Sequence, residues 1–192
     1  MAKSSVAVLD IRSSEITAAV GARGVNGTFI VKSKYTASYE GFAEGELIEV
    51  KSFTTAILDV VKRLISSVND KIKTFYIGVP GEFLKVINTD KTISFSSSKK
   101  IKRSDVASLI KYSSPEAVKG YEVFYNAALY YVLSDKRRTV NPIGAVSDCL
   151  RGKLCFYLCK NSFIDCVENA FKEFNKIQLV FLPSCHTEAT YL

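Results

Sequence analysis

The sequence contains little histidine and little proline, and both shortages exclude function classes. Its 192 residues include one histidine, four prolines and ten glycines. Because His186 is the sole imidazole, metal sites built from several histidines are excluded, and any Ser-His-Asp or Cys-His mechanism would have to use it. The low proline and glycine contents exclude collagen-like and low-complexity chains.

Long apolar runs are absent as well. No run approaches the ~18 residues of a membrane-spanning helix, and Met1 to Ser5 lead directly into a strand-like segment without the apolar stretch of a secretory signal. The five cysteines are odd in number and form no Cys-x-x-Cys pair. This usage is typical of a reduced compartment, so we expect a cytoplasmic protein without metal sites or disulfides.

What the sequence does contain is the composition of an ordered domain. Hydrophobic residues make up 47% and charged residues 23% of the chain, enough for one large domain or two small ones. The net charge is +7, and its excess lies in the middle, where residues 99–153 carry 11 basic and 5 acidic side chains.

The first part of the chain predicts a layered α/β domain. Apolar and β-branched runs predict buried strands, and apolar residues at helical spacing predict a long helix. Strands are expected at Val6–Ile11, Ile16–Val20, Thr28–Ser38 (after a turn at Asn26-Gly27) and Thr74–Val79, and the helix at about 50–69. Three strands, a helix and a strand favour a parallel crossover connection.

The middle of the chain predicts a small α+β unit. A hairpin is expected from 83–87 and 92–95 around a turn at 88–91, followed by a short helix that Ser104 caps. Tyr121–Leu133 is predicted as a strand, and alternation predicts another at 153–159.

The last part returns to the first pattern. Ser162 and Asp165 form a capping box for a predicted helix, a strand follows at 177–182, and a helix is expected to begin at Cys185. The predicted fold class is therefore α/β with a mixed sheet, interrupted by a small α+β unit. The expected division is 1–82 plus 161–192 for the large subdomain and 83–160 for the inserted one.

The turn between the first two strands is the best candidate for chemistry. Phosphate binding uses backbone N–H groups and hydroxyls in a tight turn, with a carboxylate that can hold hydrated Mg²⁺. Asp10, Ser13 and Ser14 could supply these groups. A polar turn without function remains the alternative, because Asp and Ser favour turns in any case.

At this turn and at later points the chain resembles FtsA, a bacterial cell-division family of the actin-like ATPase superfamily. The family's opening segment usually reads Leu-Asp-Ile-Gly-Thr-Ser-Lys, and residues 9–15 here read Leu-Asp-Ile-Arg-Ser-Ser-Glu. Gly41 and Gly45 resemble the family's glycine pair before its first long helix, and residues 141–144 resemble the Asn-Pro-Val-Gly turn of its inserted subdomain. The order and spacing of these motifs cover essentially the whole chain.

The resemblance implies the first lobe of an actin-like (ribonuclease H-like) fold, with ATP and Mg²⁺ as ligands. The family's second phosphate turn, adenosine pocket, second lobe and membrane tail have no counterpart in these residues. Asp10 and Ser13 match the family's motif, whereas Arg12 replaces its glycine and Glu15 its usual lysine. We therefore expect weak or degenerate nucleotide binding through Asp10, Arg12, Ser13 and Ser14, and no catalytic residue.

Two basic runs in the middle segment form a second candidate site. They comprise Lys99, Lys100, Lys102 and Arg103, and Lys136, Arg137 and Arg138. Such runs are typical of a partner surface or an anionic surface, and more often of lysines that protect exposed strand edges. Nucleic acid is the less favoured ligand.

The residues and the resemblance together predict a cytoskeletal scaffold of bacterial cell division or shape. The expected partners are further copies and division proteins, among them the family's tubulin-like division-ring protein. The expected location is cytoplasmic, at the inner face of the membrane, with membrane contact only through segments outside this sequence. Two alternatives stay open: an active actin-like ATPase whose second lobe lies outside these residues, and a basic module for DNA or anionic lipid.

Overall fold

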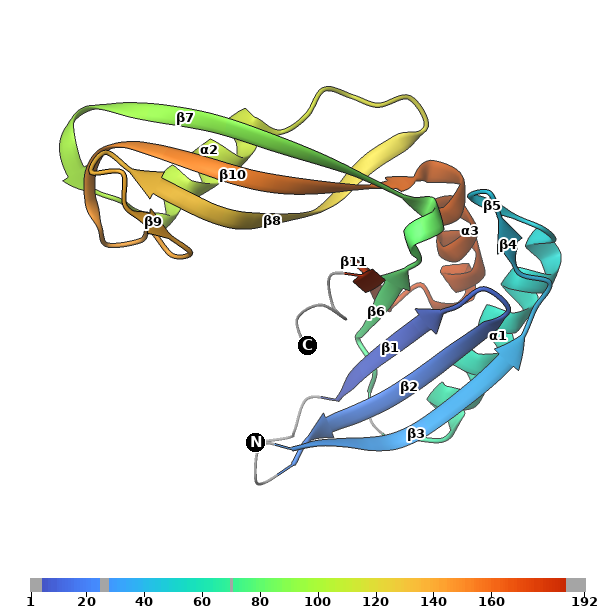
Figure 1. The fold of residues 1–192 in the computed structure, drawn as a ribbon. Helices are drawn as coiled ribbons and strands as arrows, with labels where there is room; N and C mark the ends of the chain where they lie inside the picture. The colour runs from blue at the N-terminus through green and yellow to red at the C-terminus, as the bar shows by residue number, and fades with distance from the viewer. Residues whose placement is uncertain (1–4, 25–27, 70, 186–192) are drawn as a thin grey trace. The chain divides into compact units, whose positions relative to one another are not determined.

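The structure, a computed structural model, describes residues 5–24, 28–69 and 71–185 (Figure 1). The chain divides into two compact units: unit 1 is Met1–Leu84 with Cys159–Leu192, and unit 2 is Lys85–Leu158. The turn predicted at Asn26-Gly27 lies outside the described residues, as does His186.

A five-stranded mixed sheet forms the centre of unit 1, as the sequence predicted. The strand order is β11-β6-β1-β2-β3. β1 pairs in parallel with β6 and antiparallel with β2, and β11 pairs in parallel with the other side of β6. The strands are β1 (Val6–Ile11), β2 (Glu15–Arg23), β3 (Phe29–Ser38), β6 (Thr74–Val79) and β11 (Gln178–Pro183).

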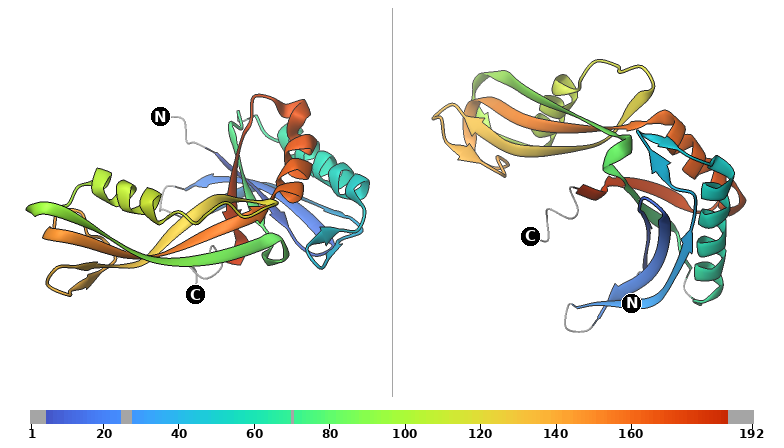
Figure 2. Two further views of the ribbon diagram at one scale, coloured as in Figure 1. Left: turned by 90° about the horizontal axis from the view of Figure 1, so that it is seen from above. Right: turned by 45° about the vertical axis from the view of Figure 1, so that its right-hand side comes forward.

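Two helices, α1 (Val50–Ser66) and α3 (Asn161–Phe171), cover one face of this sheet (Figures 1 and 2). Alternation along β1 turns Ala7, Leu9 and Ile11 into the core, where they are at most 3% exposed. Aromatic rings join the layers: the centroids of Phe53 on α1 and Phe163 on α3 lie 5.9 Å apart. The predicted long helix is confirmed, and it ends three residues earlier than expected.

Short elements connect the layers of unit 1. β4 (Phe42–Ala43) and β5 (Glu46–Leu47) form a small hairpin before α1, and the 3-10 turns η1 (Gly81–Phe83) and η2 (Lys172–Phe174) follow β6 and α3. The side chain of Glu49 caps α1 by accepting from the backbone N–H groups of Lys51, at 2.9 Å, and Ser52. None of the described helices is long and apolar enough to span a membrane.

Unit 2 is a four-stranded sheet with one helix, α2 (Arg103–Ser113), on one of its faces (Figure 2). The strand order is β7-β10-β8-β9. The strands are β7 (Leu84–Lys100), β8 (Tyr121–Leu133), β9 (Arg138–Thr139) and β10 (Val146–Lys160). The core between α2 and the sheet consists of Ile101, Leu109, Tyr131, Leu133, Leu150, Leu154, Phe156 and Leu158. The predicted strand at Tyr121–Leu133 is confirmed to the residue.

The hairpin predicted at the start of unit 2 is wrong, because β7 is one continuous strand of 17 residues. Residues 88–91 are of the type that favours turns. Two of them instead bond to β10: Asp90 accepts from Arg151 at 2.6 and 2.7 Å, and Asn88 from the thiol of Cys155 at 2.8 Å. These contacts across the sheet outweigh the local turn preference.

Two predicted helix caps are also wrong. Helix α2 begins before Ser104, and the Asp105 carboxylate accepts from the backbone N–H of Lys102 at 2.8 Å. Helix α3 has Lys160 as its N-cap residue and no side-chain cap, so Ser162 and Asp165 form no capping box. The ammonium group of Lys160 reaches the β4–β5 hairpin, where it pairs with Glu46 and donates to the Gly45 carbonyl at 3.0 Å.

Gly152 provides a test of the packing in unit 2. A Cβ at this position of β10 would lie 2.8 Å from Cδ2 of Leu109, a side chain of α2 with no exposed surface. We expect Gly152→Ala to lower the free energy of unfolding by about 1–2 kcal/mol through overpacking. The control is Gly81→Ala, where no atom lies within 4 Å of the new Cβ. Urea unfolding measures both, and a Gly152→Ala variant at least as stable as wild type would contradict this packing.

Candidate functional site

The carboxyl ends of three parallel strands meet at one edge of the unit 1 sheet. Asp10, the last but one residue of β1, lies beside Gly78 of β6, and Gly78 in turn pairs with Leu182 of β11. A Cβ on Gly78 would lie 2.9 Å from the hydroxyl oxygen of Ser184 and 3.8 Å from a carboxylate oxygen of Asp10. Glycine thus keeps open the edge at which α/β sheets bind ligands.

The turn after β1 is held from behind by Tyr39, which follows β3. The phenol of Tyr39 donates to the carbonyl of Arg12 at 2.6 Å, and its backbone N–H donates to the carbonyl of Ser14 at 3.0 Å. Gly41 packs closely against the same turn. A Cβ on Gly41 would clash with the carbonyl oxygen of Ser13. Tyr39 is 7% exposed, and burial raises the pKa of its phenol, which therefore stays a donor.

Tyr39 and Gly41 together, called the Tyr39 clamp below, fix the direction of the peptide groups in the turn. The carbonyls of Arg12, Ser13 and Ser14 face Tyr39 and Gly41, and the Arg12 N–H donates to Glu15 at 2.9 Å. Within the described part of the chain, the N–H groups of Ser13 and Ser14 form no hydrogen bond. A turn with two unbonded N–H groups is suited to an anion such as a phosphate oxygen.

The carboxylate of the turn is less suited to Mg²⁺. The guanidinium Nε of Arg12 donates to the carboxylate of Asp10 at 3.0 Å, and the two side chains are 72% and 40% exposed. Arg12 would compete with a metal ion for this carboxylate. The backbone of Arg12 is outside the left-handed region, so replacement of the family's glycine causes no backbone strain here. The obstacle to a metal ion is therefore the Arg12 side chain and its charge.

The first basic run lies where β7 meets α2. The ammonium of Lys99 pairs with Asp105 at 2.7 Å and lies 4.1 Å from the ring centroid of Phe95. The hydrogen bond from Lys99 and the one from the backbone N–H of Lys102 hold the pKa of the Asp105 carboxyl below its usual value. Lys100 ends β7, and Arg103 opens α2.

The second basic run lies at the turn between β8 and β9. Lys136 has a left-handed backbone with φ of 64°. Arg137 lies 3.7 Å from the carboxylate of Asp135, and the guanidinium of Arg138 stacks 4.9 Å from the ring centroid of Tyr130.

The turn at 141–145 connects the two runs. Ile101 donates to the carbonyl of Ala145 at 2.8 Å, and Gly144 donates back to Ile101 at 2.9 Å. A cavity of about 210 Å³ adjoins the turn, lined by Leu133, Arg137, Arg138, Thr139, Asn141 and Ala145. The structure therefore brings both predicted runs to one end of unit 2.

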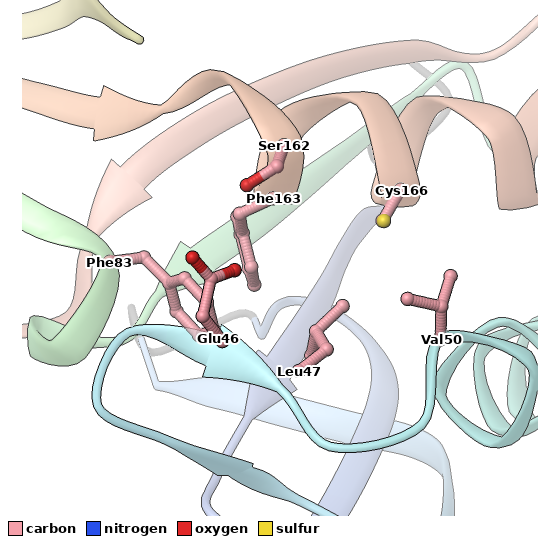
Figure 3. Close-up of a pocket in the computed structure, with 7 residues that line it drawn as sticks. All are labelled: Glu46, Leu47, Val50, Phe83, Ser162, Phe163 and Cys166. Carbon is pink, nitrogen blue, oxygen red and sulfur yellow. The ribbon is translucent and has the colours of Figure 1, made fainter.

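Sequence reasoning missed an apolar pocket in unit 1. Figure 3 shows side chains from β5, α1, η1 and α3 around a cavity of about 60 Å³; they are Glu46, Leu47, Val50, Phe83, Ser162, Phe163 and Cys166. The rings of Phe83 and Phe163 stack with centroids 4.4 Å apart and line this cavity. Val50, which also lines it, is 50% exposed. The available signal was Leu47 and Val50, two apolar residues at the start of the helix.

No group of three or more metal-ligating side chains occurs among the residues that the structure describes. Cys185 is exposed, and its neighbour His186 lies outside the described residues.

Comparisons with known proteins find similar solved structures. The chain is similar to a solved structure of the PilM-PilN type IV pilus biogenesis complex, with a TM-score of 0.54 and 12% sequence identity over 93% of this chain and 46% of that one. Another solved structure, a Bacteroides thetaiotaomicron protein with an actin-like ATPase fold and unknown function, gives a TM-score of 0.33 and 8% identity over 98% and 56%. No family model matches the sequence, and no curated protein matches it.

The first of these similarities bears on the fold alone. The predicted fold class, an α/β fold with a mixed sheet, is confirmed, and the fold is similar to that of the PilM-PilN structure. The chain spans 46% and 56% of the two solved structures named above.

Gly41 tests the clamp on the turn. Gly41 and Gly120 both have left-handed backbones, with φ of 89° and 79°, but only at Gly41 would a Cβ meet backbone, whereas nothing lies within 4 Å at Gly120. We expect Gly120→Ala to cost about 1 kcal/mol of unfolding free energy, and Gly41→Ala about 2 kcal/mol beyond that. Urea unfolding followed by circular dichroism measures both. Equal losses would contradict the close contact with Ser13.

Proposed function

We propose that this chain is the first lobe of an actin-like scaffold of the FtsA type, which acts in bacterial cell division or shape. Its work would be done by protein contacts, with nucleotide as a weak ligand at most. The actin-like fold and the motifs shared with the FtsA family support this proposal. The ion pair between Arg12 and Asp10 at 3.0 Å carries it, because that pair occupies the carboxylate that a nucleotide's Mg²⁺ would need.

The turn still fits part of a nucleotide. The N–H groups of Ser13 and Ser14 would hold a phosphate oxygen, and the charge of Arg12 would attract it. Glu15 would repel the same phosphate, and Asp10 would have to leave Arg12 before it could contact a hydrated Mg²⁺. The charges therefore oppose one another, so turnover of ATP is not part of the proposed function.

The apolar pocket of unit 1 supplies a surface for a protein partner. Val50, 50% exposed at the start of α1, lines this pocket together with the stacked rings of Phe83 and Phe163. Exposed aliphatic residues beside a pocket favour an apolar anchor from a partner. The similar solved structure is of a PilM-PilN complex, so a protein complex in which this fold occurs has a precedent. For the FtsA type, the partner is the tubulin-like division-ring protein.

The basic end of unit 2 supports a second, electrostatic contact. Unit 2 carries 13 basic and 6 acidic side chains, so the whole net charge of +7 belongs to it and unit 1 is neutral. An acidic surface on a partner protein would complement the positive charge at this end of unit 2. DNA or anionic lipid would be the ligand only if retention fell steeply with salt and was lost on charge reversal at Lys99, Lys100, Lys102 and Arg103.

Calorimetric titration with Mg·ATP tests the nucleotide part of the proposal. We expect no saturable heat below about 1 mM ligand, because Arg12 occupies Asp10. Arg12→Gly is the matched variant, since it restores the family's residue and frees the carboxylate. Affinity that appears in this variant and not in wild type supports the proposal, whereas micromolar affinity of the wild type contradicts it.

Binding to the tubulin-like division-ring protein of the same organism tests the scaffold part. We expect Val50→Glu to weaken co-sedimentation with its polymers at least about tenfold, by placing a charge at the apolar pocket. A carboxylate in the first turn of a helix is favourable, so α1 is not destabilised. The control is Ile30→Glu, a change at another exposed aliphatic residue of unit 1, 56% exposed on β3. No binding by the wild type, or equal losses in both variants, would contradict the proposal.

A further inference from the structure

The outer edge of β8 has no neighbouring strand over most of its length. In the order β7-β10-β8-β9, strand β9 pairs only with Tyr131 and Val132. From Tyr121 to Tyr130, no strand of the described chain lies beyond β8. Leu133 donates to the carbonyl of Arg137 at 3.1 Å, so its peptide faces outward, and alternation turns the N–H of Leu129 the same way.

This edge lacks the protection that the other outer strands have. Natural sheets discourage pairing at their edges with lysine, proline or shortness. Strand β3 carries Lys32 and Lys34, β11 is short and ends in Pro183, and β7 carries four lysines (85, 91, 99 and 100). Residues 121–130 of β8 include no lysine, arginine or proline. Their exposed side chains include Val123 and Leu129, 41% and 51% exposed.

We infer that the β8 edge is a self-association surface, at which two copies of this chain pair their β8 strands antiparallel around a two-fold axis. Strand pairing satisfies the outward peptide groups of both copies and joins their sheets into one. A two-fold contact uses the same patch twice and closes after two copies. Such a contact accounts for an edge that is unprotected on a sheet whose other edge is well protected.

Charge selects β8 over β7 for this contact. When two β8 strands pair about Tyr125, Glu122 lies opposite Ala128 of the other copy, so no like charges meet. When two β7 strands pair about Phe95, Lys91 lies opposite Lys99 of the other copy. Like charges directly opposite each other are destabilising in a sheet.

The contact gives the proposed scaffold its means of self-association, and in that sense it rests on the proposed function. It needs neither nucleotide nor the pocket beside Val50. The two can therefore fail separately: loss of partner binding would leave the β8 dimer intact, and a strictly monomeric chain would leave partner binding untouched.

Sedimentation equilibrium of two matched variants tests the inference. Leu129→Lys places a positive charge on the β8 edge, and Val86→Lys places the same charge on β7 at a residue with nearly the same exposure, 50% against 51%. Between about 5 and 500 µM chain, we expect the wild type to pass from monomer to dimer. Leu129→Lys should raise the dissociation constant at least about tenfold, and Val86→Lys should leave it unchanged.

Hydrogen exchange provides a second readout that needs no variant. Dilution of the dimer should lower the protection of amides in 121–130 and leave those in 92–98 of β7 unchanged. A chain that is monomeric throughout the range overturns the inference. So does a dimer that resists Leu129→Lys, one that Val86→Lys weakens equally, or one whose protection changes lie outside β8.

Discussion

The parallel pairing of β6 with β1 on one side and β11 on the other is the constraint on which this structure depends. The register places Asp10 and Leu182 on either side of Gly78, although these residues come from the beginning, middle and end of the chain. Parallel strands require long crossover connections. Between β6 and β11 that connection contains all of unit 2, with its own core. The chain can thus extend its surface without disturbing the edge at which a ligand would bind.

The turn that follows β1 combines a backbone suited to an anion with side chains that oppose a hydrated metal ion. Tyr39 and Gly41 hold the carbonyls of the turn from behind, so the N–H groups of Ser13 and Ser14 remain available whatever side chains the turn carries. The side chains then decide the ligand. In the family that the turn resembles, a glycine stands where this chain has Arg12, which bonds to the neighbouring Asp10. A turn whose backbone suits an anion thus carries side chains that oppose a hydrated Mg²⁺, as the proposed function requires.

How far the sequence predicts this molecule depends on the range of the interactions. The buried strands and α1 follow from local apolar periodicity, and the predictions for β1, β6 and β8 match the structure to the residue. Residues 88–91 were predicted as a turn because their bonds to Arg151 and Cys155 on β10 are distant in sequence. The Tyr39 clamp and the pocket beside Val50 likewise depend on contacts between segments that no local pattern reveals.

The central claim is that an actin-like turn persists here without serving as a nucleotide site. The backbone amide resonances of Ser13 and Ser14 report on it most directly, because these N–H groups would contact the phosphate. During addition of Mg·ATP, the account predicts that both resonances stay in place below about 1 mM ligand. Saturable shifts of both resonances at micromolar ligand would contradict it.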